Sequence, residues 1–137
     1  DTTVRTQAAS EFVTRYGHDL PDNIRADVVK ETMQILEHPE YAGLFGPASR
    51  AEVPITGLIH GKLVSGQIDR LLVTDTHVHI VDYKTNRPPP QDASDVPALY
   101  RQQLAAYRDT LAAIYPHRTI KTWLLWTDGP NLMAIKP

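Results

Sequence analysis

The apolar positions in the first third of the chain recur at helical spacing. Between residues 2 and 16 they form one stripe with a step of four: Val4, Ala8, Phe12 and Tyr16. This stripe predicts an amphipathic helix. A second helix is expected to start at Pro21 and to end before Pro39, because proline fits the first turn of a helix and stops its interior. With a short helical turn from Tyr41 to Phe45, residues 1–47 are predicted to form a helical part.

From residue 50 onward the apolar positions alternate with a period of two, which predicts strands. Residues 50–57 form the first strand, in which Pro54 has no amide hydrogen to give to a neighbour. That strand is therefore expected at a sheet edge or at a bulge. Residues 63–74 and 77–84 continue as a meander around the polar turn Thr74-Asp75-Thr76-His77.

Prolines 88–90 interrupt the sheet, and a long helix is expected to follow from residue 95 until Pro116 stops it. Residues 119–127 and 132–135 then read as two strands joined by the turn signal Asp128-Gly129. The predicted order is α-α-β-β-β-α-β-β. This order indicates one α/β domain over residues 1–137, with a mixed central sheet flanked by helices and a core over residues 48–137.

The composition fits an ordinary globular chain and excludes several functional classes. Hydrophobic residues make up 42% of the 137 residues and charged residues 22%. With no cysteine, disulfides and thiolate metal sites are excluded. No apolar run approaches the roughly 18 residues of a membrane span. The formal charge of −2 lacks the basic excess of a tight, free-standing DNA binder, so DNA affinity is expected to need a partner or more chain.

The hairpin from residue 66 to residue 87 carries the candidate chemistry. If Asp75 and Thr76 form its loop, then Val73 faces Val78, and the same register sets Asp69 opposite Asp82. Facing carboxylates destabilise a sheet unless something compensates their charge.

Two kinds of partner could compensate these acids. Lys84 lies on the same strand face as Asp82, and a divalent cation such as Mg²⁺ is commonly held by one or two carboxylates. The alternative is a purely structural ion pair of Asp69 and Asp82 with Lys84 or Arg70. The spacing alone leaves both interpretations open.

Three strings of the sequence resemble a known family. They are residues 50–55 (RAEVPI), 66–71 (GQIDRL) and 81–87 (VDYKTNR). An acid at the end of a glycine-containing strand, then a hairpin, then Asp-x-Lys resembles the PD-(D/E)XK nuclease superfamily. The longer strings are similar to the C-terminal nuclease domain of bacterial AddA/RecB-type helicase–nuclease subunits, with the AddA branch the nearer match. The resemblance implies a restriction-endonuclease-like core.

The resemblance also implies roles for particular residues. Asp69 and Asp82 would bind the metal together with the backbone carbonyl of Tyr83, and Lys84 would be the catalytic lysine that orients water and stabilises charge on the phosphate. Glu52 matches an acidic position on the family's first strand.

The helix after the proline run carries a second element of the family. Gln103 and Tyr107 fit its Gln-x-x-x-Tyr signature, whose spacing of four places both side chains on one helical face. The resemblance implies that they position DNA; without it, a core tyrosine beside an exposed glutamine is the simpler interpretation. Arg87 and Arg101 are candidate phosphate contacts, and each can equally be an ordinary surface charge.

The function that the resemblance implies is a Mg²⁺-dependent DNA nuclease that acts as an exonuclease on single strands, with Mn²⁺ as a substitute metal. It would be part of a helicase–nuclease that processes DNA ends in recombinational double-strand break repair in the bacterial cytoplasm. ATP would enter only through the helicase part, and single-stranded DNA ends and an AddB-like second subunit would be its partners; no membrane partner is expected.

One family feature has no match here. The histidine or glutamate on a helix before the first strand is expected upstream of Asp1, in a longer protein, which would leave the metal site of this chain incomplete and its activity low. Two other functions stay open. A catalytically silent nuclease fold could dock a partner or guide DNA, or an unrelated α/β domain could bind a small molecule.

Overall fold

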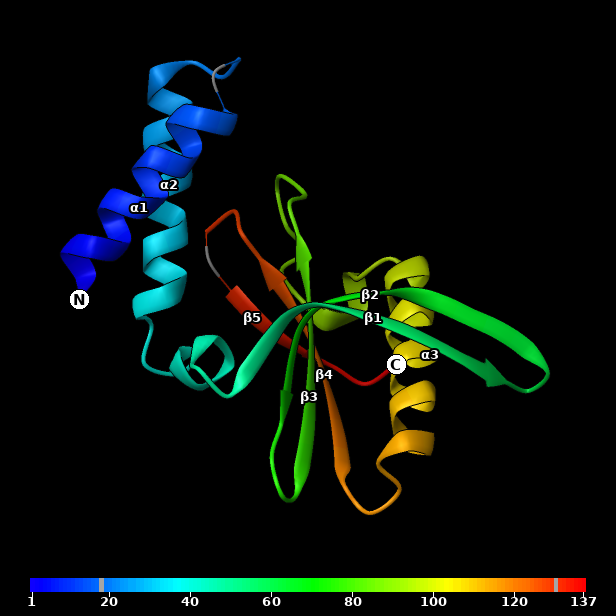
Figure 1. Ribbon diagram of the computed structural model, residues 1–137. Coiled ribbons are helices and arrows are strands. Elements are labelled where there is room, and N and C mark those ends of the chain that lie inside the picture. Colours follow the sequence, from blue (N-terminus) through cyan, green and yellow to red (C-terminus); the bar gives the residue numbers. More distant parts are fainter. Residues whose placement is uncertain (18, 130) are drawn as a thin grey trace. The chain divides into compact units, whose positions relative to one another are not determined.

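The computed structural model of the protein describes residues 1–17, 19–129 and 131–137, without the side chains of Phe12, Arg15 and Tyr16. Two positions of the predicted first stripe, Phe12 and Tyr16, therefore have side chains outside the description. The chain divides into two compact units, residues 1–42 and 43–137. The element order α-α-β-β-β-α-β-β is confirmed, and the fold is the predicted mixed α/β class (Figure 1).

The first unit consists of the two predicted helices, α1 (Thr2–Tyr16) and α2 (Asp22–Glu37). Helix α1 begins where the Asp1 carboxylate accepts a hydrogen bond from the amide of Thr3. The apolar stripes are less buried than their spacing predicts: Val4 is 63% exposed and Ile24 is 40% exposed. Two packed helices cover only a narrow seam of each other.

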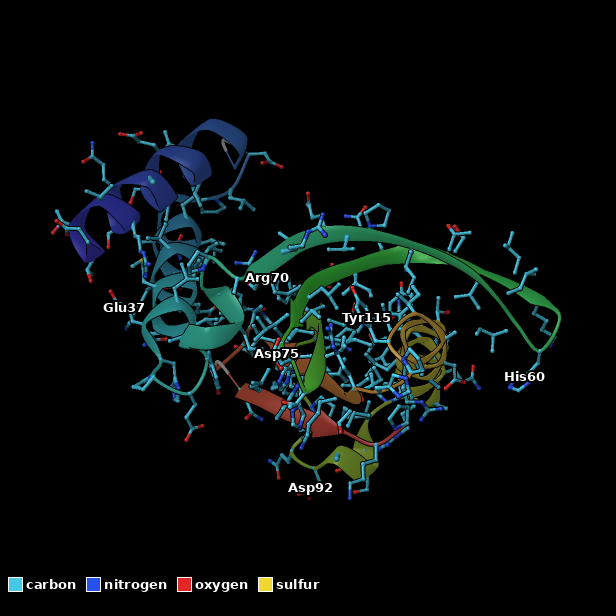
Figure 2. All side chains as sticks on the ribbon, turned by 60° about the horizontal axis from the view of Figure 1, so that its bottom comes forward. Glu37, His60, Arg70, Asp75, Asp92 and Tyr115 are labelled. Atoms are coloured by element: carbon cyan, nitrogen blue, oxygen red, sulfur yellow. The ribbon has the colours of Figure 1, made fainter. Side chains whose placement is uncertain are left out.

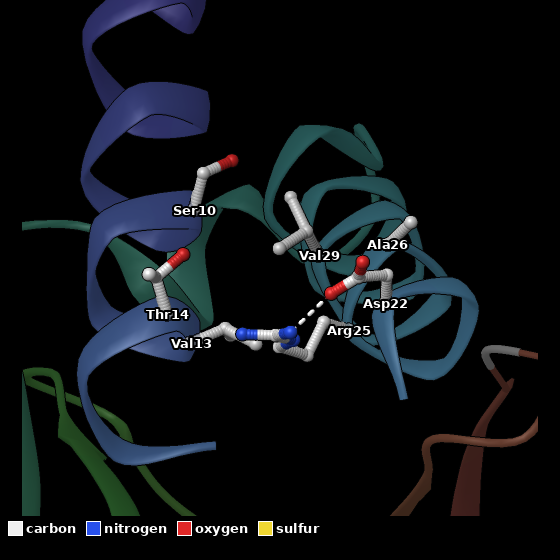
Figure 3. Close-up of a pocket in the computed structure, with 7 residues that line it drawn as sticks. All are labelled: Ser10, Val13, Thr14, Asp22, Arg25, Ala26 and Val29. Atoms are coloured by element: carbon white, nitrogen blue, oxygen red, sulfur yellow. Dashed lines mark hydrogen bonds and ion pairs between the residues drawn. The ribbon is translucent and has the colours of Figure 1, made fainter. Parts of the chain in front are cut away.

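The seam between the helices holds a hollow of ≈ 510 Å³ (Figure 3). It is lined by residues of both helices: Ser10, Val13, Thr14, Asp22, Arg25, Ala26 and Val29. Arg25 and Asp22 form an ion pair with each other at its edge. Because the two charges compensate each other, this ion pair suits a structural role.

The second unit is built on five strands and one long helix. The strands are β1 (Ser49–Ile59), β2 (Lys62–Val73), β3 (His77–Lys84), β4 (Thr119–Trp126) and β5 (Asn131–Ile135). The helix is α3 (Ala98–Ile114), and two short 3₁₀ turns, η1 (Ala42–Phe45) and η2 (Ala93–Asp95), complete the set. No helix among the described residues is long and apolar enough to cross a membrane.

The strands lie in the order in which they occur in the sequence, β1-β2-β3-β4-β5. Strands β3 and β4 are parallel, and all other neighbours are antiparallel. Parallel neighbours need a crossover connection, and α3 supplies it between β3 and β4. The helix packs on one face of the sheet, where it contacts β1 to β4 (Figure 1).

The core lies between α3 and the sheet. Its fully buried side chains come from the middle of the sheet and from the inner face of the helix: Val78, Ile80, Leu104, Leu124 and Trp126. Pro54 lies in β1, which is an edge strand, as its missing amide hydrogen predicts. Strands β1 and β2 form a long hairpin that runs across α3, with His60 at its far tip (Figure 2).

A second feature of the sheet is a cluster of rings on β3 and β4. His77 and His79 stack with ring centroids 5.8 Å apart, and Trp123 donates its indole N–H to Nδ1 of His79 over 3.2 Å. Burial lowers the pKa of His79 below its usual value, and the neighbouring His77 and Lys121 lower it further. Since Nδ1 accepts a hydrogen bond, the fold holds His79 as a neutral imidazole.

This lowered pKa predicts how stability depends on pH. His79 binds a proton more weakly in the folded chain than in the unfolded chain, so its stabilisation is complete above the unfolded pKa of about 6.5. It is lost as the pH falls through the lower folded pKa. We expect His79→Gln, which keeps an acceptor for Trp123, to flatten the fall in unfolding free energy between pH 7.5 and pH 5 in urea titrations.

The matched control is His60→Asn at the hairpin tip. The backbone φ of His60 is 50°, which asparagine tolerates. This variant should keep the wild-type dependence on pH. An unchanged dependence in His79→Gln would show that His79 does not set it.

Candidate active site

The two predicted acids lie where β2 separates from β3. The strands pair from Arg70 opposite Val81 to Val73 opposite Val78, which is the predicted register. One step further, at Asp69, the backbone pairing has ended, and an Asp69 carboxylate oxygen accepts the amide hydrogen of Tyr83 over 2.7 Å. A side chain thus replaces the backbone ladder at this point.

Asp82 is the more buried of the two acids, with 6% of its surface exposed. Burial raises the pKa of this carboxyl above its usual value. The Lys84 ammonium opposes this rise in the pKa of Asp82, whereas the nearby Asp69 carboxylate adds to it. The facing acids therefore interact as the register predicts, and the pKa of Asp82 is the one that rises.

Lys84 reaches back to Asp82 from the end of β3. Its Nζ lies 2.7 Å from Oδ2 of Asp82, and the Lys84 side chain is 16% exposed. The buried Oδ2 still has no well-aligned hydrogen bond. On α3, Oε1 of Gln103 lies 3.4 Å from Nζ and accepts a hydrogen bond from it. The site thus combines an acid pair, one cation and a helix that contacts the cation.

Gln103 and Tyr107 share one face of α3, as their spacing predicts. The amide of Gln103 donates to the Tyr107 hydroxyl over 3.3 Å, and this hydroxyl donates to the carbonyl of Gln67 on β2 over 3.4 Å. Tyr107 is buried in the core cluster. The tyrosine therefore fixes α3 against β2, and a contact of Gln103 or Tyr107 with DNA stays a prediction.

The helix can come this close because residue 66 is glycine. A Cβ built on Gly66 would lie 2.5 Å from the Tyr107 hydroxyl oxygen, much nearer than side chains tolerate. The glycine of the string at residues 66–71 and the tyrosine on α3 therefore belong to one contact.

Glu52 lies on β1, the neighbour of β2 on the side away from β3. The ladder of β1 and β2 pairs Ala51 with Arg70 and Val53 with Ile68, so Glu52 stands opposite Asp69 by count. Its backbone is unusual, with a φ of 51°, and its side chain is exposed. The edge strand is therefore distorted at the level of the acid pair.

The two arginines make contacts within the chain. Arg87 pairs with Asp128 over 3.3 Å near the turn between β4 and β5. Arg101 donates to the backbone carbonyls of Ala93 and Lys136. The two bonds of Arg101 tie α3 to its neighbours. Contact of either arginine with phosphate stays a prediction.

Tyr100 also lies at the site, which the sequence did not predict. Its place on the apolar stripe of the helix favours packing, and its ring does contact Trp126. The ring also lies 4.0 Å from Nζ of Lys84, and its hydroxyl donates to Asn86 over 3.2 Å. The available signal was its place one turn before Gln103 on the same helical face.

With this geometry in place, comparison with known proteins is informative. The family profile of the PD-(D/E)XK nuclease superfamily matches residues 5–131. The chain belongs to this superfamily. Its nucleases are generally metal-dependent and typically use Mg²⁺. The predicted superfamily is thus confirmed, whereas the narrower AddA/RecB assignment stays a prediction.

Other comparisons add little. The chain is similar to the solved protein titled "Crystal structure of SSO0001", with 15% identity and a TM-score of 0.41 over 83% of this chain. The match covers 60% of that structure. A likeness this weak carries no argument about function. A comparison with curated proteins finds no match.

The donors of this PD-(D/E)XK domain fit a Mg²⁺ ion. Asp69 and Asp82 supply hard oxygen ligands, and the buried Oδ2 of Asp82 lacks an aligned hydrogen bond. In the described parts of the chain, no three His, Asp or Glu side chains are grouped for a metal. Mg²⁺ usually keeps several waters and takes one or two carboxylates, so two are enough for a weak site.

The acid pair predicts how the protein responds to metal. Without metal, Asp69→Asn should stabilise the fold by roughly 0.2–1 kcal/mol, the range for one cross-strand pair, because it removes the charge beside Asp82. The amide oxygen can still accept the Tyr83 N–H. With Mn²⁺, the wild type should gain stability as the concentration rises, and the variant should gain none. Urea unfolding with EDTA or Mn²⁺ measures both effects.

The control for this comparison is Asp75→Asn, at the exposed turn between β2 and β3. It should respond to Mn²⁺ as the wild type does. Equal gains in Asp69→Asn and the wild type would exclude Asp69 as a ligand.

The close contact of Gly66 with Tyr107 gives a second test. Gly66→Ala should destabilise the fold by about 1–3 kcal/mol, the usual cost of overpacking, because the new methyl group displaces the Tyr107 hydroxyl. Gly43→Ala is the control, because a Cβ at residue 43 meets no atom within 4 Å. Thermal unfolding compares the two variants, and equal losses would contradict the contact.

Proposed function

We propose that this domain is a Mg²⁺-dependent DNA nuclease that hydrolyses phosphodiester bonds. The observation that carries this proposal is the meeting of Asp69, Asp82 and Lys84 at the point where β2 separates from β3. Burial raises the pKa of Asp82 beside a second acid, and such perturbed groups cluster at functional sites. Membership of the PD-(D/E)XK superfamily supports hydrolysis as the reaction.

The residues divide the work as follows. Asp69 and Asp82 would hold the cation, with the carbonyl of Tyr83 as a further ligand. When bound, the cation supplies Lewis-acid polarisation of the scissile phosphate. Lys84 is held over Asp82 at 2.7 Å and presents its positive charge where negative charge develops on the phosphate oxygens. Gln103 orients this ammonium through its carbonyl oxygen.

The finer assignment is to the nuclease part of an AddA/RecB-type helicase–nuclease in the bacterial cytoplasm. The strings at residues 50–55, 66–71 and 81–87 support it, as does the pairing of Gln103 with Tyr107 on α3. In this proposal the domain cleaves single-stranded DNA ends during double-strand break repair. A helicase part would use ATP, and an AddB-like subunit would be the partner.

One observation favours a second candidate, a catalytically silent module that guides DNA or docks a partner. Lys84 already compensates Asp82 without any metal, through the ion pair at 2.7 Å. In a silent copy this pair would be purely structural. The two candidates differ in one measurable property, which is cleavage that depends on Mg²⁺.

Cleavage of end-labelled single-stranded DNA tests the proposal. With Mg²⁺, Asp82→Asn should lower kcat by about 10²–10³-fold, the range known for the loss of one preorganised electrostatic contact in an active site. Lys84→Arg should not keep wild-type activity, because the planar guanidinium of arginine cannot take the place of the compact lysine ammonium. EDTA should abolish cleavage by the wild type.

Asp75→Asn serves as the control and should cleave at the wild-type rate. Undiminished cleavage by Asp82→Asn would refute the nuclease site. DNA binding by the wild type, without cleavage and without Mn²⁺ binding that depends on Asp69, would favour the silent module instead.

A further inference from the structure

Lys84 is enclosed on three sides by groups from two elements. Asp82 lies before it on β3, with Oδ2 2.7 Å from Nζ. Gln103 of α3 approaches at 3.4 Å, and the face of the Tyr100 ring lies 4.0 Å from the same nitrogen. The first two contacts belong to the site already proposed, whereas the aromatic one has no role in it.

The contact with Tyr100 has the geometry of a cation–π interaction. A cation within about 6 Å of a ring centroid is attracted by the negative face of the ring, and the attraction grows when water is excluded. The Lys84 side chain is only 16% exposed, so it meets both conditions.

A lysine needs such a restraint more than an arginine does. Its ammonium ends a flexible chain of four carbons, and a single ion pair leaves it many positions. The ring of Tyr100 adds a third contact to those of Lys84 with Asp82 and Gln103. A fixed ammonium can then direct a remaining N–H toward a phosphate oxygen without reorganising.

Tyr100 is itself held in place at both ends. Its ring packs against the buried Trp126 with centroids 6.3 Å apart, and its hydroxyl donates to Asn86, two residues beyond Lys84. The ring therefore lies on a rigid support and also restrains the segment that leaves β3.

We infer that Tyr100 is a positioning residue, whose ring face holds the Lys84 ammonium in its productive place beside Asp82. The inference rests on the proposed nuclease function for its effect on catalysis. Its effect on the lysine itself is independent of any substrate.

A series of rings at residue 100 tests the inference without changing the shape of the core. Phenylalanine and its mono-, di- and trifluoro analogues keep the ring, while each fluorine weakens the negative face. We expect log kcat to fall steadily along the series, with a total loss of about 2- to 30-fold and little change in KM. A flat series would overturn the inference, because a ring that only packs is indifferent to its electron density.

A second measurement needs no activity. In the wild type and in Tyr100→Phe, the ring current should shift the Cε protons of Lys84 upfield in the NMR spectrum, and Tyr100→Leu should abolish that shift. An unchanged shift in Tyr100→Leu would overturn the inference. If the wild type neither cleaves DNA nor binds Mn²⁺ through Asp69, the proposed function fails, and this spectrum alone decides the role of Tyr100.

Tyr115, near the end of α3, provides the matched control. The guanidinium carbon of Arg118 lies 4.9 Å from the centroid of this ring, which also packs against the core. Tyr115→Leu should cost stability but leave both kcat and the Lys84 shift at their wild-type values. A change in either value in this control would show that the loss of any ring in this region disturbs the site, which contradicts a specific role for Tyr100.

Discussion

The site depends on one electrostatic constraint, the placement of two carboxylates across the last step of the hairpin of β2 and β3. A regular ladder would hold Asp69 directly opposite Asp82, where their charges repel. Instead, the ladder ends at Arg70, and Asp69 accepts the amide hydrogen of Tyr83. The backbone donor that the broken ladder leaves at Tyr83 is thereby satisfied by the acid itself. The strands therefore separate at the same point at which the Asp69 side chain turns toward Tyr83. Lys84 supplies a positive charge beside Asp82, which partly balances the two carboxylates.

The crossover helix makes the second half of the site. Parallel pairing of β3 with β4 requires a long connection over one face of the sheet, and α3 therefore passes above Lys84. The distance between α3 and the sheet depends on Gly66, because the absence of a side chain there lets the Tyr107 hydroxyl reach β2. The same helix then carries Gln103 toward the ammonium. A packing contact in the core thus fixes the distance between a helix and a charge at the surface of the site.

The sequence predicted the features that depend on neighbouring residues. The turn at Asp75 and Thr76 sets the register of a hairpin locally, and the observed pairs of Val73 with Val78 and of Arg70 with Val81 follow from it. The superfamily was recognisable because Asp69, Asp82 and Lys84 lie within one short stretch. The contact of Tyr100 with Lys84 was not predictable, because it depends on how far α3 sits from β3. The same holds for Trp123 and His79, which meet only through the pairing of β3 with β4.

In the proposed nuclease, the electrostatics of Asp82 would link metal binding to substrate binding. Burial raises the pKa of Asp82 despite the opposing Lys84 ammonium, and a cation beside both acids would offset this cost of burying the carboxylate. Within residues 1–17, 19–129 and 131–137, no third acid or histidine joins the pair in a metal-binding group. The remaining positions around a Mg²⁺ ion would then be filled by water and phosphate oxygens. Each of the two ligands would strengthen the binding of the other, because this coupling is reciprocal. Under the proposed function, such a site would hold its cation most firmly when a nucleic acid strand is bound.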